Sequence, residues 1–121
     1  MNRMVRIPNV NNNVAFEMPK RKPKHRVMLY EKMIQLEKEK PDEMKKREYR
    51  QLMEGAYLAL FIIQDKHPDA KIEDILSLSD DMNDDENILR VSCIAYGTDY
   101  DEIKKTITSE TKDFQKTEQN Q

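Results

Sequence analysis

One short segment constrains the fold of this 121-residue chain more than any other feature. Residues 56–63 have the sequence AYLALFII, which would make a helix apolar on every side. Such a helix is normally the buried centre of its domain. We therefore predict a central helix from residue 42 to about residue 66, with Asp42 as its N-cap. Gly55 inside it costs about 1 kcal/mol relative to alanine, and a close helix crossing at that point would explain its presence.

The residues before the central helix have an amphipathic pattern that predicts another helix over residues 25–40. Apolar side chains recur there at the 3.6-residue spacing of one helix face. We expect these side chains to face the core: Val27, Tyr30, Met33, Ile34 and Leu36. Lys38, Lys40 and Pro41 mark the end of this helix, because cations suit a helix C-terminus and proline cannot continue a helix.

The C-terminal half predicts three more helices and a tail. The helices cover residues 70–78, 85–96 and 98 to about 107, with a loop at 79–83. Asp69 can cap the first of them, Gly97 is the expected residue after the second, and Thr98 can cap the third. Residues 108–121 are polar apart from one phenylalanine, so we expect a disordered tail.

The N-terminal residues have the period of β-strands. Residues 4–8 and 14–18 alternate in polarity, and the asparagine-rich residues between them suit a turn. We expect a β-hairpin over residues 1–19, and a basic, proline-containing linker over residues 20–24. The predicted fold is therefore mainly α: a short N-terminal β-hairpin, then a compact bundle of about four to five helices over residues 25–107.

Charge is distributed unevenly along the chain. Residues 1–26 hold seven basic side chains and one acidic side chain, whereas residues 65–121 hold seven basic and fifteen acidic side chains. The total net charge is nevertheless only −2. This gradient favours head-to-tail association or an oppositely charged partner, although two solvated ends could also differ by chance.

No residue pattern for catalysis is present in the sequence. The two histidines, His25 and His67, lack the spacing of metal ligands, and two glycines cannot supply a phosphate-binding loop. The acidic run over residues 80–86 lacks the glycine and glutamate positions of a calcium-binding EF-hand. We therefore predict no enzymatic activity, no catalytic residue, no metal site and no cofactor.

Cys93 is the only cysteine of the chain. It would lie on the helix over residues 85–96, where we predict Leu89, Ile94 and Tyr96 to be core. A buried thiol with no basic residue placed to activate it is inert. We also expect neither a membrane span nor a secreted disulfide scaffold, because apolar runs are short and no second cysteine exists.

The basic residues 20–26 raise the question of nucleic-acid binding, because clustered cations bind phosphates. The chain is acidic overall, with a pI of about 5.7, and the prolines make this stretch a poor recognition helix. We therefore do not expect nucleic acid to be the partner. A solvated linker, or a docking segment for an acidic surface such as the acidic half of another copy, would also account for these charges.

The order of these parts resembles the tail assembly chaperones of long-tailed phages that infect Gram-positive bacteria. In that family a short β segment leads through a stretch rich in Lys, Arg and Pro into helices. The resemblance is one of arrangement and covers roughly residues 14–97. The matching stretches are VAFEMPKRKPKHR at 14–26, ALFII at 59–63, IEDIL at 72–76 and ILRVSCIAYG at 88–97.

The resemblance implies a binding role in tail assembly. Such chaperones coat the apolar tape-measure protein, keep it soluble and hand it to tail tube subunits in the host cytoplasm, and they leave before the virion is complete. The tape-measure protein and the tail tube protein are thus the implied partners, and self-association stays open. We place partner binding on Phe16, Met18, Lys20, Arg21, Lys22, Lys24 and Arg26.

Two alternatives from other classes stay open. One is a small phage-encoded inhibitor or regulator that occupies a host protein. The other is a nucleic-acid-associated accessory protein that uses residues 20–26. The eight methionines of the chain suit an adaptable apolar surface, although we expect Met33 and Met53 to be core. Gene order would separate these classes, because a chaperone gene should lie between those for the tail tube and the tape measure.

Overall fold

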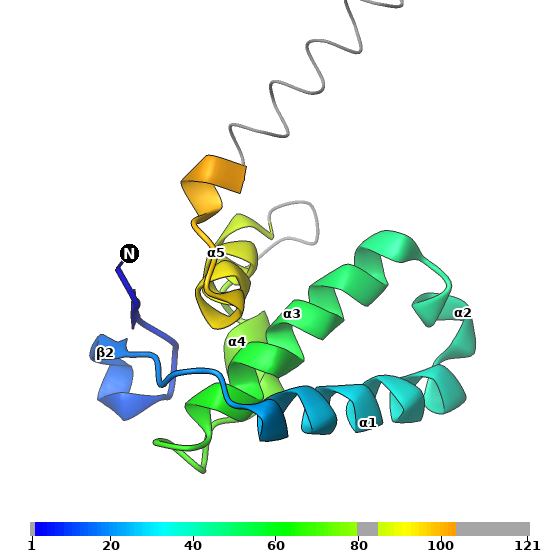
Figure 1. Ribbon diagram of the computed structural model, residues 1–121, viewed down its shortest axis with the longest axis horizontal. Coiled ribbons are helices and arrows are strands. Elements are labelled where there is room, and N and C mark those ends of the chain that lie inside the picture. The colour runs from blue at the N-terminus through cyan, green and yellow to red at the C-terminus, as the bar shows by residue number, and fades with distance from the viewer. Residues whose placement is uncertain (1, 80–84, 104–121) are drawn as a thin grey trace, which may run out of the picture.

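The computed structural model describes residues 2–79 and 85–103, and the fold is mainly helical (Figure 1). The predicted class, a short hairpin followed by a helical bundle, is confirmed. The predicted tail and the acidic run over residues 80–84 lie outside the described residues. The elements in chain order are β1 (Met4–Val5), the 3-10 turn η1 (Asn11–Asn13), β2 (Phe16–Glu17), α1 (Pro23–Glu39), α2 (Pro41–Met44), α3 (Arg47–Ile63), α4 (Ile72–Leu76) and α5 (Glu86–Tyr96).

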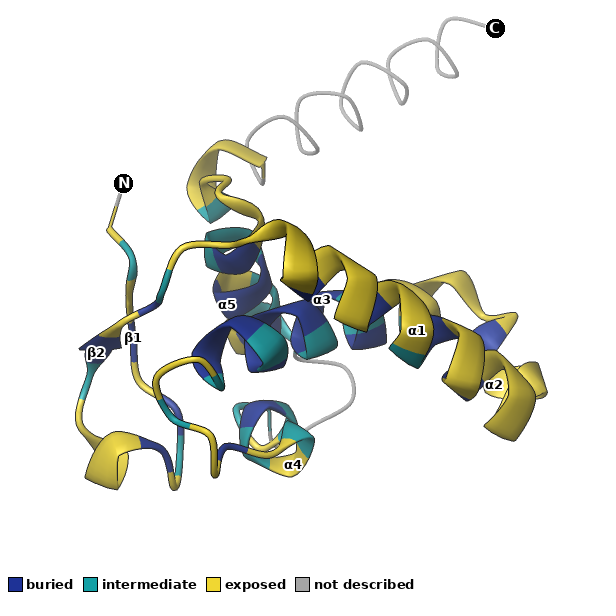
Figure 2. Cartoon of the chain, turned by 60° about the horizontal axis from the view of Figure 1, so that its bottom comes forward, coloured by how far each residue is buried: buried dark blue, intermediate teal, exposed yellow. Residues whose placement is uncertain are grey.

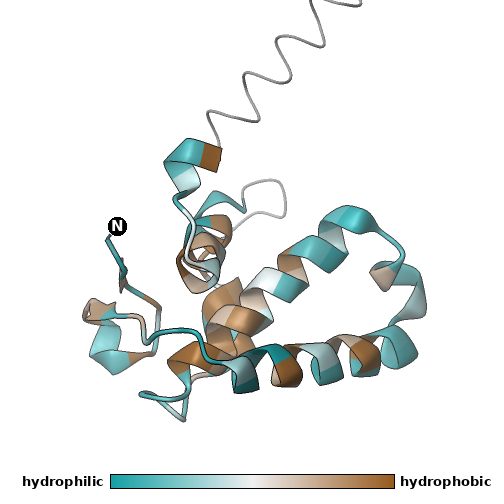
Figure 3. Ribbon diagram, in the orientation of Figure 1, coloured by the Kyte–Doolittle hydropathy of each residue, from teal (hydrophilic) through white to brown (hydrophobic). Residues whose placement is uncertain are grey.

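Helix α3 is the centre of the fold, as its sequence predicts. Each of the other four α-helices contacts it, and α5 makes the most extensive contact. Its C-terminal half is almost entirely buried (Figure 2) and is the most apolar helical segment in the view of Figure 3. Ile62 and Ile63 have no exposed surface, whereas Phe61 is only partly buried.

The predicted single helix from Asp42 onward is two helices. Pro41 is the first residue of α2, so Asp42 is not an N-cap, and the chain turns at Lys45 before α3 begins. The turn brings α2 across the ends of α1 and α3, where Met44 is only 3% exposed (Figure 1). Burying this methionine offsets the loss of a continuous helix. Helix α3 also ends three residues before the predicted position, at Ile63.

Helix α1 begins earlier than predicted, and the face that it buries differs from the predicted face. It starts at Pro23, so part of the expected linker is helical; proline is favoured there because the first turn needs no N–H donor. The buried face of α1 consists of His25, Leu29, Met33 and Leu36. The predicted core residues Val27, Tyr30 and Ile34 are instead 58%, 70% and 39% exposed. Two rows of residues have helical spacing, and His25 belongs to the row that packs inward.

Helix α5 crosses α3 at Gly55, which confirms the predicted close crossing. A Cβ built on Gly55 would lie 2.5 Å from Ser92 Oγ of α5. This approach turns Ile88, Val91, Ser92 and Ala95 inward. Tyr96, predicted as core, is therefore exposed, and Leu89, Ile94 and Cys93 are half-buried.

The end of α5 follows the sequence closely. Gly97 adopts a left-handed conformation with φ of 77°, and the Thr98 N–H donates to Cys93 O over 2.9 Å. These are the features of a Schellman motif, for which glycine is the preferred residue. The next helical turn is capped by Asp99, whose carboxylate accepts from the Asp101 N–H, and not by Thr98.

The N-terminal hairpin closes one side of the core. Strands β1 and β2 pair antiparallel, with Met4 opposite Glu17 and Val5 opposite Phe16. Four asparagines in the connecting loop have positive φ, a conformation that asparagine tolerates better than most residues. Helix α4 is shorter than predicted, and Asp74 rather than Asp69 caps it by accepting from the Lys71 N–H. Among the described residues, no helix has the length and apolar character that a membrane crossing needs.

Candidate functional site

The structure separates the predicted partner-binding residues into two groups. Phe16 and Met18 are 5% and 1% exposed, and the Phe16 ring packs edge-on against His67 at 4.6 Å between centroids. These two residues belong to the core and cannot meet a partner at the surface. The five basic side chains are all exposed, and they form what we name the basic segment: Lys20, Arg21, Lys22, Lys24 and Arg26.

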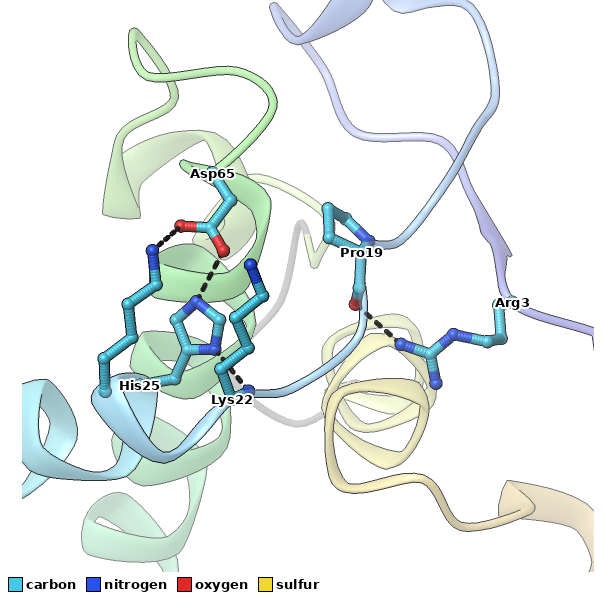
Figure 4. A network of polar contacts seen from close by, with 6 residues as sticks. Arg3, Pro19, Lys22, His25 and Asp65 are labelled. Carbon is cyan, nitrogen blue, oxygen red and sulfur yellow. Dashed lines mark hydrogen bonds and ion pairs between the residues drawn. The ribbon is translucent and has the colours of Figure 1, made fainter.

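The buried His25 lies inside this basic segment and holds the start of α1. Its Nε2 donates to Asp65 Oδ2 over 2.9 Å, and its Nδ1 accepts from the Lys22 N–H over 2.8 Å (Figure 4). Because Nδ1 is an acceptor, the ring proton is on Nε2. Lys24 Nζ lies 2.8 Å from the other oxygen of Asp65. The three side chains join the first turn of α1 to the turn that follows α3.

This histidine–aspartate pair is a structural tie and has no free nitrogen for catalysis. In a catalytic triad, one imidazole nitrogen faces the aspartate and the other faces the nucleophile. Here the second nitrogen is occupied by a backbone N–H, and the ring has no exposed surface. The hydrogen bond from Lys24 holds the pKa of the Asp65 carboxyl below its ordinary value, so the carboxylate is charged at neutral pH.

A groove runs between α1 and α3 and is the strongest candidate for a binding site. We name it the α1 groove. It encloses about 430 Å³. Buried side chains of both helices form its floor, and Tyr30, Ile34 and Tyr96, which are 70%, 39% and 37% exposed, form its apolar rim. Large exposed apolar side chains that border one depression are typical of a protein-binding surface.

The charges around the α1 groove are arranged by position along α1. Arg21 and Arg26 line the end near the start of α1, and within residues 2–79 and 85–103 neither forms an ion pair. At the far end, Glu37 of α1 and Arg50 of α3 bind each other across the groove. Glu54 of α3 also lines the groove, so the three arginines and two glutamates together give it a net positive charge.

Tyr96 contributes a neutral hydroxyl to this rim. Burial, with a smaller contribution from the negative charge of Glu54, raises the pKa of Tyr96 above its ordinary value. The phenol therefore stays protonated throughout the neutral range and can donate or accept a hydrogen bond. The sequence gives no signal for this role, because Tyr96 comes from α5 and reaches the groove only through the helix packing.

No group of three metal-binding side chains occurs within the described ranges. No protein family, curated protein or solved structure matches the chain. The α1 groove combines an apolar floor, an aromatic rim and two arginines at one end. These features suit the binding of an amphipathic segment.

Proposed function

We propose that this protein is a non-enzymatic phage tail assembly chaperone. In this role it binds the tape-measure protein, keeps it soluble in the host cytoplasm, and helps to recruit tail tube subunits before it leaves the growing tail. The observation that carries the proposal is the exposed apolar surface of α1 next to the basic segment. Tyr30 and Ile34 remain exposed on a helix whose opposite face is already buried.

Exposed apolar side chains on α1 supply the attraction that a tape-measure chaperone needs. Covering them with apolar helices of the partner would contribute about 25 cal/mol for each Å² of apolar surface removed from water. Such an interaction is non-directional, so one chaperone surface can cover many similar apolar helices along a long partner. The proposal therefore does not require that one partner sequence be matched residue by residue.

The basic segment would serve encounter and orientation more than affinity. Its exposed charges are screened within about 8–10 Å at ordinary salt concentrations, and exposed ion pairs add little net stability. Lys20 and Lys22 have no ion-pair partner in the described part of the chain. These charges would accelerate association, while the apolar contacts would keep the complex together at high salt.

Co-expression with the tape-measure protein tests the proposal. We expect the tape-measure protein, which aggregates alone, to stay soluble and to co-purify with this chain at high salt. A tail tube subunit added to this complex should bind it more tightly than it binds either protein alone. An insoluble tape-measure protein in the presence of an equal amount of this chain would contradict the proposal.

The row of exposed cations in the basic segment also favours a nucleic-acid accessory role as the second candidate. Binding to nucleic acid weakens steeply as salt rises, because bound counterions are released from the phosphates. Tight, salt-sensitive binding to DNA or RNA, together with an unchanged solubility of the tape-measure protein, would favour that second candidate. Salt-resistant co-purification would favour the chaperone.

A further inference from the structure

We propose that the α1 groove holds one amphipathic helix of the partner, oriented by carboxylates that bind Arg21 and Arg26. The inference rests on the proposed function, which supplies the partner. It adds where on the chain the partner lies and in which direction it runs.

The shape of the α1 groove suits a single helix. Its walls are two helices, α1 and α3, which run in opposite directions and diverge toward α2 (Figure 1). From Arg26 to Glu37 the wall formed by α1 is about 16 Å long, or about three helical turns. A partner helix of this length would place apolar side chains at positions i, i+3 or i+4, and i+7 on the floor. Tyr30 and Tyr96 would cover the sides of those side chains.

The charge of the groove selects what the partner helix must carry. Glu37 and Arg50 neutralise each other, whereas Arg21 and Arg26 are exposed and form no ion pair within the described ranges. The two arginines outweigh Glu54, which also lines the groove and is only partly exposed. A partner helix with Asp or Glu at one end would match this arrangement. Guanidinium groups can bind a carboxylate with two parallel hydrogen bonds, which fixes direction as well as position. A helix bound in the opposite direction would leave both arginines without a counter-charge.

The chain offers two matched control sites for this inference. Lys45 and Lys46, between α2 and α3, are exposed cations like Arg21 and Arg26, but they lie outside the basic segment and do not line the groove. Val27 lies on α1 beside Tyr30, is 58% exposed and does not line the groove either. If the partner were held only by a general attraction to positive charge or to apolar surface, substitutions at the test sites and at the control sites would weaken binding equally.

The experiment uses the full chain and fluorescently labelled peptides of about 20 residues, long enough for the three turns of the groove, that together cover the tape-measure protein. Fluorescence anisotropy identifies the tightest peptide for the unmodified chain. We expect Arg21→Glu with Arg26→Glu, and separately Tyr30→Ala, to weaken its binding by about tenfold or more. Lys45→Glu with Lys46→Glu, and separately Val27→Ala, should weaken it by less than about threefold.

A charge exchange tests the orientation. Replacing the acidic residues at one end of the peptide by lysine should weaken binding to the unmodified chain and restore binding to the Arg21→Glu, Arg26→Glu variant. All substituted side chains are exposed, and circular dichroism of each variant checks that the helices remain. Replacing acids at the other end of the peptide should have little effect.

The possible negative results distinguish a failure of the proposed function from a failure of this inference alone. If no peptide binds the unmodified chain, the proposed function falls, and this inference falls with it. If a peptide binds but the test and control variants weaken equally, or if the charge exchange restores nothing, the inference alone is wrong. A stable homodimer that Tyr30→Ala dissociates would also overturn it, because a second copy would then occupy the groove.

Discussion

Gly55 of α3 and Ser92 of α5 lie so close that a methyl group on Gly55 would overlap both side-chain atoms of Ser92. The distances from a Cβ built on Gly55 would be 2.5 Å to Ser92 Oγ and 2.7 Å to Ser92 Cβ. The hydroxyl of Ser92 is buried, but it donates to Ile88 O over 2.8 Å and is satisfied within its own helix. The missing side chain of Gly55 thus allows α5, the main neighbour of α3, to approach.

We therefore expect Gly55→Ala to destabilise the fold, although alanine is the better helix former. Overpacking at this contact should cost about 1–3 kcal/mol, measured as the free energy of unfolding in urea. The double variant Gly55→Ala, Ser92→Gly exchanges the two residues across the contact and should recover most of the loss. Ser92→Ala should not rescue Gly55→Ala, because the Cβ remains. A Gly55→Ala variant more stable than the unmodified chain would contradict the close crossing.

Two neighbouring residues of α3 should differ in their contribution to stability. Ile62 has no exposed surface, so Ile62→Ala should cost about 2–5 kcal/mol. Phe61 is only partly buried and packs its ring against Tyr57 at 5.8 Å between centroids, so Phe61→Ala should cost less. Thermal unfolding followed by circular dichroism measures both variants. Equal losses of stability in the two variants would contradict the difference in burial between Ile62 and Phe61.

Asp65 should make stability depend on acidic pH. Its native pKa is lowered, chiefly by the hydrogen bond from Lys24, so the native state binds its proton less readily than the unfolded chain does. The stabilisation is present above the unfolded-state pKa of about 4 and is lost as the pH falls through the lower native value. Asp65→Asn should flatten the decline of the melting temperature in this range. Asp69→Asn, at an exposed position, is the matched control and should leave the decline unchanged.

His67 presents a buried polar atom that nothing in the described part of the chain satisfies. Its Nε2 is buried without a hydrogen-bond partner, while the ring packs edge-on against Phe16. His67→Phe keeps an aromatic ring beside Phe16 and removes the unpaired nitrogen. We expect the free energy of unfolding to rise by about 1 kcal/mol. A loss of stability would mean that the nitrogen has a partner, such as a bound water molecule.

The sequence predicted the elements whose signals are local. Three predictions of this kind are confirmed, because each depends only on neighbouring residues. They are the buried helix from the apolar run in α3, the end of α5 from the glycine that follows it, and the β-hairpin from the alternation around the asparagine loop. Met33 and Met53 are buried as expected. The turn between α2 and α3 was missed because it contains neither glycine nor proline. It depends on the burial of Met44 against helices on both sides.

The direction in which α1 faces depends on a distant residue, so the sequence alone could not settle it. His25 interrupts the inward row with a polar residue, which favoured the alternative row through Val27, Tyr30 and Ile34. The partner that permits His25 to be buried, Asp65, is 40 residues away. For the same reason the basic segment was found but the α1 groove was not: Arg50 and Tyr96 join it only when three helices have packed.

Arg3 joins the first strand to the last helix of the domain. Its guanidinium donates to the carbonyl oxygens of Met18 and Pro19, and also to Ile94 O of α5, which is 91 residues away in sequence. Closing so long a loop costs more entropy than closing the short loops that join α1, α2 and α3. We therefore expect the middle of the chain to fold first and the N-terminal hairpin to dock last. In hydrogen exchange, the amides of β1 and β2 should open before those of α3, and the first event of unfolding should be the release of Arg3 from α5.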